Sequence, residues 1–161
     1  MIIDAWTDGG AKKLGSTFYG GWAWVIPQFE GAKKTYTGWG THVQTTSNAM
    51  ELQAFIQVTK FIEEHLQQFE ITGINIYTDS MYLVNGYTKF LDVWMKKGWV
   101  THNGTTVANI ETWTKILQIR RNSVPIKFTW VKSHSGDEHN TQCDLLVKKA
   151  LNHIIDEYKK L

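Results

Sequence analysis

Four carboxylates stand out in this sequence because of the positions that the surrounding pattern gives them. Asp8 and Asp79 each follow a short run of β-branched and aromatic residues, so each is expected at the carboxyl end of a strand. Glu51 and Asp144 lie on or beside the apolar stripes of two amphipathic helices, where an unpaired carboxylate is costly. Clustered carboxylate oxygens without cysteine ligands favour Mg²⁺ or Mn²⁺ over zinc. Two such ions about 4 Å apart can hold the attacking and leaving oxygens of phosphodiester hydrolysis.

Each of these acids also has a purely structural interpretation. Asp8 and Asp79, taken singly, are better explained as turn-forming or capping aspartates. Glu51 fits a capping box that starts at an N-cap Asn48, although apolar residues four, seven and eleven positions later continue a core-facing stripe on its own face. The pattern alone leaves these two interpretations of Glu51 even. His134, in a polar loop, would by itself more often be a surface histidine than a catalytic one.

The elements that must position these side chains alternate between strand and helix along the chain. Three strands should come first as an antiparallel meander, with Asp8-Gly9-Gly10 as the turn that ends the first. The expected strands are 2–7, 20–27, 33–40, 74–77 and 126–131, and the expected helices are 48–69, 81–87, 90–97, 109–121 and about 140–161. This order predicts one α/β domain, residues 1–161, with helices packed on the faces of a mixed sheet.

Composition narrows the class of protein without identifying it. A hydrophobic content of 42% and eight tryptophans exclude a disordered chain. The single cysteine, Cys143, excludes an internal disulfide framework. No secretion signal is recognisable near Met1 and no apolar run could span a bilayer, so we expect no membrane association and a cytoplasmic location.

Charge is informative through its distribution, because a net charge of +2 decides little. Twelve of the 17 basic residues form doublets, most of which are best explained as solvated surface. Only Lys96-Lys97, which lies among aromatic residues, suggests a binding groove.

Taken together and in order, the motifs resemble ribonuclease H of the type 1 class. The segments that carry the likeness are Thr7-Asp8-Gly9, Asn48-Ala49-Met50-Glu51-Leu52, Tyr77-Thr78-Asp79-Ser80, Trp94-Met95-Lys96-Lys97-Gly98-Trp99, and His134-Ser135-Gly136 followed by Asn140 and Cys143-Asp144. The likeness covers nearly the whole chain, and the ordered set is far more specific than any single tripeptide.

The resemblance implies a ribonuclease H-like fold, in which a mixed five-stranded sheet with three antiparallel strands leading is flanked by helices. It also implies Mg²⁺-dependent endonucleolytic cleavage of the RNA strand of an RNA–DNA hybrid. Asp8, Glu51, Asp79 and Asp144 would hold two Mg²⁺ ions, for which Mn²⁺ could substitute, and His134 would move protons or assist product release.

The resemblance further implies which residues meet the hybrid. Groups near the RNA strand would be Gly9, Ser47, Asn48 and Gln53; a DNA-phosphate pocket would include Thr46 and Asn109; and Phe90 and Trp94 would face DNA sugars, although helix packing also explains these two rings. Because phosphate contacts position a duplex without specifying its sequence, little sequence preference is expected.

The chain departs from the family pattern in ways that bear on binding. The segment 11–19 replaces the usual Gly/Pro-rich turn after the first aspartate, and Gln44 stands where some relatives place arginine. We therefore expect weaker, more salt-sensitive hybrid binding than in a strongly basic relative. No separate hybrid-binding domain and no obligate protein partner are expected, and the chain should act as a monomer.

Other functions remain open at this stage. A catalytically inactive module that binds hybrids or duplex RNA would have no need for the complete carboxylate set. A resolvase-like nuclease of the same fold would act on DNA, and an inverting glycosidase would need no metal.

Overall fold

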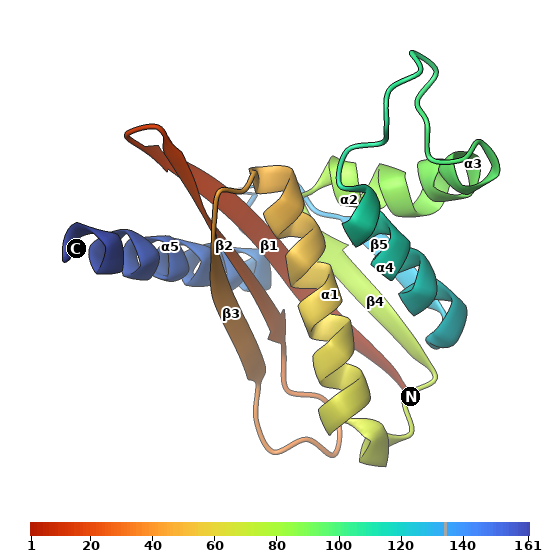
Figure 1. Ribbon diagram of the computed structural model, residues 1–161. Coiled ribbons are helices and arrows are strands. Elements are labelled where there is room, and N and C mark those ends of the chain that lie inside the picture. The colour runs from red at the N-terminus through yellow and green to blue at the C-terminus, as the bar shows by residue number, and fades with distance from the viewer. Residues whose placement is uncertain (134) are drawn as a thin grey trace.

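The computed structural model, which describes residues 1–133 and 135–161, is built on a five-stranded mixed sheet (Figure 1). The strands are β1 (Ile2–Leu14), β2 (Thr17–Ile26), β3 (Tyr36–Val43), β4 (Gly73–Thr78) and β5 (Ile126–Trp130), arranged in the order β3-β2-β1-β4-β5. β1, β2 and β3 pair antiparallel, whereas β4 pairs parallel to β1 and β5 parallel to β4. The predicted fold class, with three antiparallel strands leading, is confirmed.

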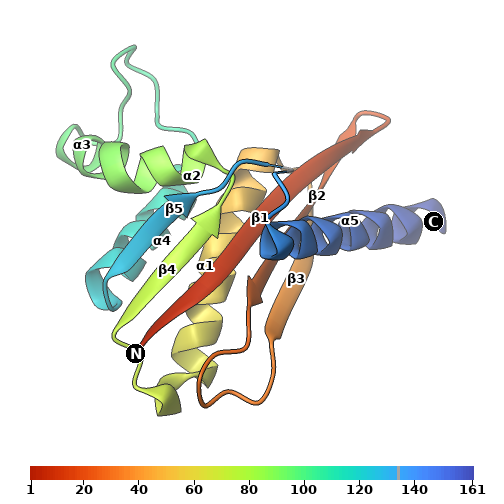
Figure 2. The same ribbon diagram turned by 180° about the vertical axis from the view of Figure 1, so that it is seen from behind.

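Helices cover both faces of the sheet, as Figures 1 and 2 show from opposite sides. α1 (Ser47–His65) and α4 (Ile110–Asn122) lie on one face, and α5 (Glu138–Lys159) crosses the other. α2 (Met81–Asn85), a π-helical turn (Gly86–Phe90) and α3 (Leu91–Lys96) form a nearly continuous rod beside the end of β5, and a 3₁₀ turn (Gln67–Phe69) follows α1. Among the described residues, no helix is long and apolar enough to cross a membrane.

Side chains from alternate positions of β1 build two apolar cores. Ile3 and Ala5 point into the larger core under α1 and α4, whereas Trp6 joins a smaller core with Cys143 and Val147 of α5. Because a strand directs successive side chains to opposite faces, a strand covered by helices on both sides reads as a continuous apolar run. β1, the central strand of the sheet, is accordingly buried without interruption from Ala5 to Asp8, while Asp4 stays exposed.

The predicted turn at Asp8-Gly9-Gly10 is wrong. β1 continues through these residues to Leu14, and Gly9 and Gly10 pair with Trp22 and Gly21 of β2. The two glycines are needed for close packing instead. A Cβ at Gly9 would lie 2.4 Å from the backbone carbon of Met50, and one at Gly10 would lie 3.3 Å from Val147 Cγ1.

The predicted boundaries of α1 are also wrong at both ends. The N-cap is Thr46, whose Oγ1 accepts a hydrogen bond from Ala49 N at 3.1 Å, so Asn48 lies inside the helix. The capping box from Asn48 to Glu51, one of the two interpretations left open for Glu51, therefore does not form. At the other end α1 stops at His65 instead of continuing to Phe69, and β4 opens at Gly73.

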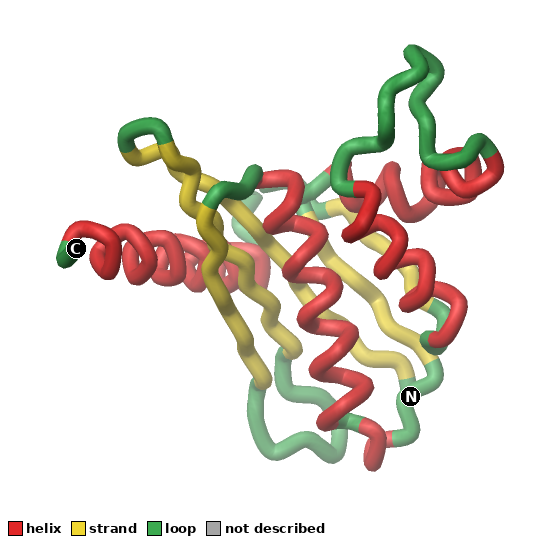
Figure 3. The backbone as a smooth tube through the Cα atoms, in the orientation of Figure 1, coloured by secondary structure: helices red, strands yellow, loops and turns green. Residues whose placement is uncertain are grey.

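Trp113 of α4 packs against the π-helical turn that joins α2 and α3. Its ring packs against Gly86, where a Cβ would lie 2.1 Å from Trp113 Cη2. The two helices predicted separately are thus one rod with a local widening that begins at Gly86, where Trp113 of α4 packs. The tube representation in Figure 3 shows this rod leading into the long 97–109 connection before α4.

Candidate active site

Three of the four carboxylates identified in the sequence come together at the end of the sheet where α1 begins. Asp8, Glu51 and Asp79 each offer a carboxylate oxygen within 4.8 Å of the others. The parallel register pairs Trp6 of β1 with Tyr77 of β4, so the residues two positions farther along, Asp8 and Asp79, emerge side by side. Glu51 reaches the same point from α1.

Gly9 permits this arrangement. Its Cα faces the backbone of Met50 and Glu51 so closely that any side chain would collide with α1. The peptide of Gly9 also serves the site directly, because its N–H donates to Asp8 Oδ1 at 2.9 Å. Because glycine has no side chain, the first turns of α1 can approach β1 at residue 9.

Asp79 is held by its backbone neighbours. Trp130 Nε1 donates to the carbonyl oxygen of Asp79 at 3.1 Å. Ser80 caps α2, with its Oγ accepting from Leu83 N at 3.1 Å. The residue after β4 is thus anchored to both β5 and α2.

Burial makes this cluster electrostatically costly without a cation. Asp8 is only 6% exposed and Glu51 only 8% exposed. Desolvation, and then the charge of Asp79, raise the pKa of Asp8 to about 7, against the opposing hydrogen bond from Gly9. Desolvation, and then the charges of Asp8 and Asp79, raise the pKa of Glu51 well above its ordinary value. Among the described residues, Glu51 Oε2 is buried without a hydrogen-bond partner.

These observations fit a divalent cation. The donor set consists of closely spaced carboxylate oxygens, and Glu51 Oε2 among them has no hydrogen-bond partner in the described part of the chain. Such a set matches the coordination preferred by Mg²⁺ or Mn²⁺. A bound cation would offset the mutual repulsion that otherwise keeps protons on the cluster.

Asp144 lies apart from this group. The three-carboxylate group found among the described residues does not include it; its side chain is 28% exposed and pairs with Lys148 Nζ at 3.0 Å. It stands beside the apolar stripe of α5, since Cys143 and Val147 occupy the buried positions. Its charge still raises the pKa of Asp8, as the third-ranking cause of that increase after burial and Asp79.

Cys143 fixes the start of α5 against the sheet. Its thiol is buried and contacts two strand carbonyls as a donor, Ala23 O at 3.3 Å and Trp6 O at 3.7 Å. Burial raises the pKa of this thiol well above its ordinary value, with Asp8 the next cause. The group therefore stays protonated and acts as a structural donor that sets the position of Asp144.

His134 lies outside the described residues. The described residues that follow include Asp137, which caps α5 with its Oδ1 accepting from Asn140 N at 2.8 Å. α5 therefore begins at Glu138, two residues before the predicted start.

The residues expected near the RNA strand gather around the start of α1. Ser47 and Asn48 are exposed there, Gln53 is half-buried on the next turns, and Gly9 lies against the backbone of Met50. Ser47 Oγ accepts from Ala11 N at 3.1 Å, so this helix start is tied directly to β1 beyond the acidic cluster.

The residues expected near the DNA strand come from four places: Phe90 ends the π-helical turn, Trp94 lies on α3, Thr46 caps α1, and Asn109 precedes α4. The rings of Phe90 and Trp94 stack with centroids 5.7 Å apart, and Trp94 also packs on Trp113. Trp94 therefore does serve helix packing, while Phe90 stays largely exposed.

Tyr82 is a residue that the sequence analysis missed. Asn109 adopts a left-handed conformation and makes no capping bond with its side chain; instead its Nδ2 donates to Tyr82 Oη at 3.0 Å. The same oxygen accepts from Trp113 Nε1 at 3.0 Å. Tyr82 thus orients Asn109, and no local pattern could have linked residues 27 positions apart.

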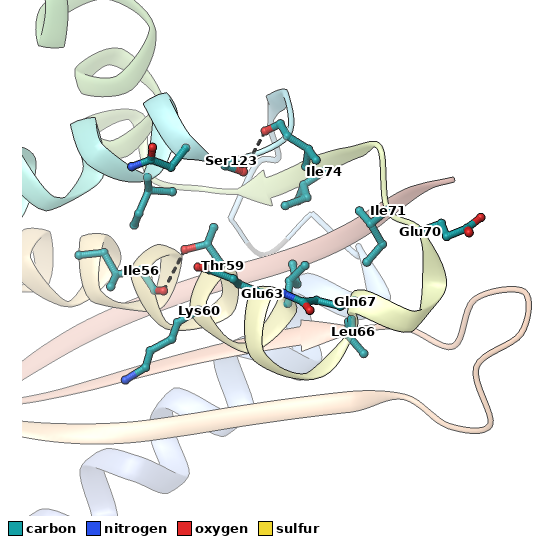
Figure 4. Close-up of a pocket in the computed structure, with 14 residues that line it drawn as sticks. Ile56, Thr59, Lys60, Glu63, Leu66, Gln67, Glu70, Ile71, Ile74 and Ser123 are labelled. Carbon is teal, nitrogen blue, oxygen red and sulfur yellow. Dashed lines mark hydrogen bonds between the residues drawn. The ribbon is translucent and has the colours of Figure 1, made fainter.

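A large apolar groove lies elsewhere. Figure 4 shows it between the second half of α1, the end of α4 and the start of β4, with a volume of about 760 Å³ and an apolar lining that includes Ile56, Leu66 and Ile71. None of the predicted site residues lines it.

Comparisons with known proteins agree on one family. A family model described as RNase H matches residues 3–152. Ribonuclease H of Wolbachia sp. subsp. Drosophila simulans (strain wRi) is 36% identical over 149 residues, which cover 92% of this chain and 94% of that protein. Ribonuclease H of Hahella chejuensis is 35% identical over 153 residues, covering 92% and 95%.

Solved structures show the same fold. LC9-RNase H1, described as a type 1 RNase H with the type 2 active-site motif, has a TM-score of 0.75 at 22% identity, covering 94% of this chain and 72% of that chain. LC11-RNase H1 in complex with RNA/DNA hybrid has a TM-score of 0.68 at 22% identity, covering 95% and 99%.

Proposed function

The chain belongs to the RNase H family and is an enzyme of the nuclease class, and we propose that it is an endoribonuclease that hydrolyses the RNA strand of RNA–DNA hybrids. The observation that carries this proposal is the meeting of Asp8, Glu51 and Asp79 from β1, α1 and β4 at one end of the sheet. The LC11-RNase H1 structure, which holds an RNA/DNA hybrid, supports the choice of substrate.

The family is metal-dependent, and we propose a two-metal site for Mg²⁺, with Mn²⁺ as a substitute. Asp8, Glu51 and Asp79 would hold the ions, and Asp144 would join them after its carboxylate leaves Lys148. When bound, the ions supply Lewis acidity and charge neutralisation at the scissile phosphate.

The chain's own groups prepare the site for that chemistry. Asp8 and Glu51 are buried and must lose protons when the cations arrive, so cation affinity is expected to rise with pH. The Gly9 N–H keeps the Asp8 carboxylate oriented, and the anchored backbone at Asp79 keeps that carboxylate in place before substrate binds. His134 is proposed to move protons or to assist product release.

Substrate contacts are proposed on both sides of the cluster. Gly9, Ser47, Asn48 and Gln53 would contact the RNA strand, where 2′-hydroxyl groups distinguish RNA from DNA. Thr46 and Asn109 would bind a DNA phosphate, with Tyr82 holding Asn109 in place. Phe90 and Trp94 would lie against DNA sugars, with little dependence on base sequence.

We further propose that the chain acts as a monomeric single domain in the cytoplasm. The free thiol of Cys143 agrees with a reducing compartment.

One cleavage experiment tests the function. Labelled RNA–DNA hybrid, double-stranded RNA and double-stranded DNA are incubated with the protein, each with Mg²⁺ and with chelator. The expected result is cleavage of only the RNA strand of the hybrid, and only with the metal. Binding of the hybrid without cleavage in either Mg²⁺ or Mn²⁺ would support the inactive binding module instead, and cleavage of DNA would support the resolvase-like nuclease.

A further inference from the structure

The tip of the β1–β2 hairpin, residues 12–18, stands beyond the rest of the sheet. β4 pairs with β1 only as far as Trp6, and β3 pairs with β2 only from Tyr19 onward. Figures 1 and 2 both show the hairpin projecting at the end of the sheet where α1 begins. Leu14 and Phe18 are 40% and 45% exposed. Such an exposed tip contributes little to the core and is available for a partner.

The hairpin presents different side chains on its two faces. Gly9 and Gly20 face α1, since Cβ atoms there would meet Met50, so Lys13 and Phe18 share that face by strand alternation. Lys13 Nζ lies 5.7 Å from the centre of the Phe18 ring, which keeps the ammonium on this side. Lys12 pairs with Tyr19 on the opposite face, toward α5.

The face that carries Lys13 adjoins the start of α1. Gln44 N donates to Phe18 O at 2.9 Å, and Ala11 N donates to Ser47 Oγ at 3.1 Å. The tip is therefore fixed relative to the exposed helix start at which the RNA strand is proposed to bind. On the other side of the acidic cluster stand α3 and the 97–109 connection, so a duplex lying along this end of the molecule would meet a projection at each side (Figure 1).

Charge complementarity identifies the occupant. No acidic residue occurs between Asp8 and Glu30, and the ion pairs found among the described residues include neither Lys12 nor Lys13. A positive tip with an apolar ring beside it fits a sugar–phosphate backbone.

From these contacts we infer that Lys13 at the hairpin tip makes a second, outlying contact with a phosphate of the hybrid. The inference rests on the proposed function and extends its binding surface. Lys13 is five residues beyond Asp8 in β1, which is about 17 Å at about 3.3 Å per residue. With phosphates about 3.4 Å apart along one strand, the contact falls about five nucleotides from the cleaved bond.

The experiment compares lysine variants on hybrids of two lengths. A short ribonucleotide block in a DNA strand, paired with complementary DNA, fixes the cleavage position, and the flanking duplex is either longer or shorter than about five base pairs on each side. KM and kcat are measured for wild type, Lys13→Ala, Lys13→Arg, Lys12→Ala and Lys60→Ala at several salt concentrations. Lys60 lies at the opposite end of α1, beside the large groove, and serves as the distant control.

Lys13→Ala should raise KM about five-fold on long-flanked hybrid without changing kcat, and should reduce the salt slope of log KM by about 0.7–0.9. On short-flanked hybrid its KM should equal that of wild type. Lys13→Arg should behave as wild type, Lys12→Ala should have less than half the effect of Lys13→Ala, and Lys60→Ala should have none.

Two results would overturn the inference. The first is an unchanged KM for Lys13→Ala on long-flanked hybrid. Lys12 and Lys13 would then be explained as charged residues that keep an exposed strand edge from aggregating. An equal rise on both hybrids would place the effect near the cleaved bond instead of at an outlying phosphate. Failure of the wild type to cleave any hybrid would refute the proposed function itself, which separates the two outcomes.

Discussion

Replacing Asp8 with asparagine should stabilise the metal-free protein while removing its activity. Burial and the charge of Asp79 raise the pKa of Asp8 from 3.8 to about 7. Ionising Asp8 therefore costs more free energy in the folded state than in the unfolded state, and above about pH 7 this difference destabilises the folded protein. Asp8→Asn removes this charge but keeps an Oδ1 atom to accept from Gly9 N–H. The variant is therefore nearly isosteric and avoids the electrostatic cost.

The size of the effect follows from the two pKa values. A group whose pKa is raised in the folded state stabilises the protein fully below its unfolded pKa, and that stabilisation is lost as pH rises through its folded pKa. The interval from 3.8 to about 7 corresponds to about 4 kcal/mol, of which about 2–3 kcal/mol falls between pH 5 and pH 8. Because Glu51 shares the cost, we expect Asp8→Asn to gain about 1–3 kcal/mol at pH 8.

Urea denaturation with chelator at pH 5 and pH 8 measures this gain. The wild type should lose stability between the two pH values, and Asp8→Asn should lose about 2 kcal/mol less. Asp156→Asn, at an exposed position on α5, is the matched control and should follow the wild type. Mg²⁺ should stabilise the wild type more than Asp8→Asn. An Asp8→Asn variant that is less stable than wild type at pH 8 in chelator, or equally dependent on pH, would refute the reasoning.

Three further predictions concern the site. Asp79→Asn should lower cleavage by at least about 10³-fold while leaving fold and hybrid binding largely intact, which rate and binding assays with circular dichroism would check; retained turnover would show that the metal site is misassigned. His134→Ala should slow turnover without abolishing it, and complete loss in a steady-state assay would give this histidine a more central role. Gly9→Ala should cost about 2–4 kcal/mol in urea denaturation and reduce cleavage, because the new Cβ would lie 2.4 Å from Met50 C and 2.5 Å from Glu51 N; Gly15→Ala at the hairpin tip should cost less, since only its positive φ opposes it. Equal losses for the two glycine variants would contradict the close packing of α1 on β1.

The kinds of element and their order could be predicted because they depend on local periodicity. Alternating apolar residues predicted the strands, helical spacing predicted the helices, and Asp79 was expected directly after a strand, where β4 in fact ends. The errors cluster where glycine and capping residues have more than one use. Gly9 and Gly10 resemble a turn in sequence, but in the fold they let two helices approach β1 from opposite faces. Asn48 resembles an N-cap in sequence, but Thr46 caps the helix by accepting from Ala49 N, and Asn48 lies inside it.

The sequence by itself determined which residues could carry chemistry, the fold class, and the family likeness, since these depend on residue type and spacing along the chain. The tertiary structure decided which of those residues meet. The parallel register of Trp6 with Tyr77 sets Asp8 beside Asp79. The close contact of α1 with Gly9 brings Glu51 to the same point. Cys143 is buried against the sheet, and the next residue, Asp144, is therefore left partly exposed, where it pairs with Lys148. Strand register and helix docking depend on contacts between residues far apart in sequence, so no local pattern encodes them.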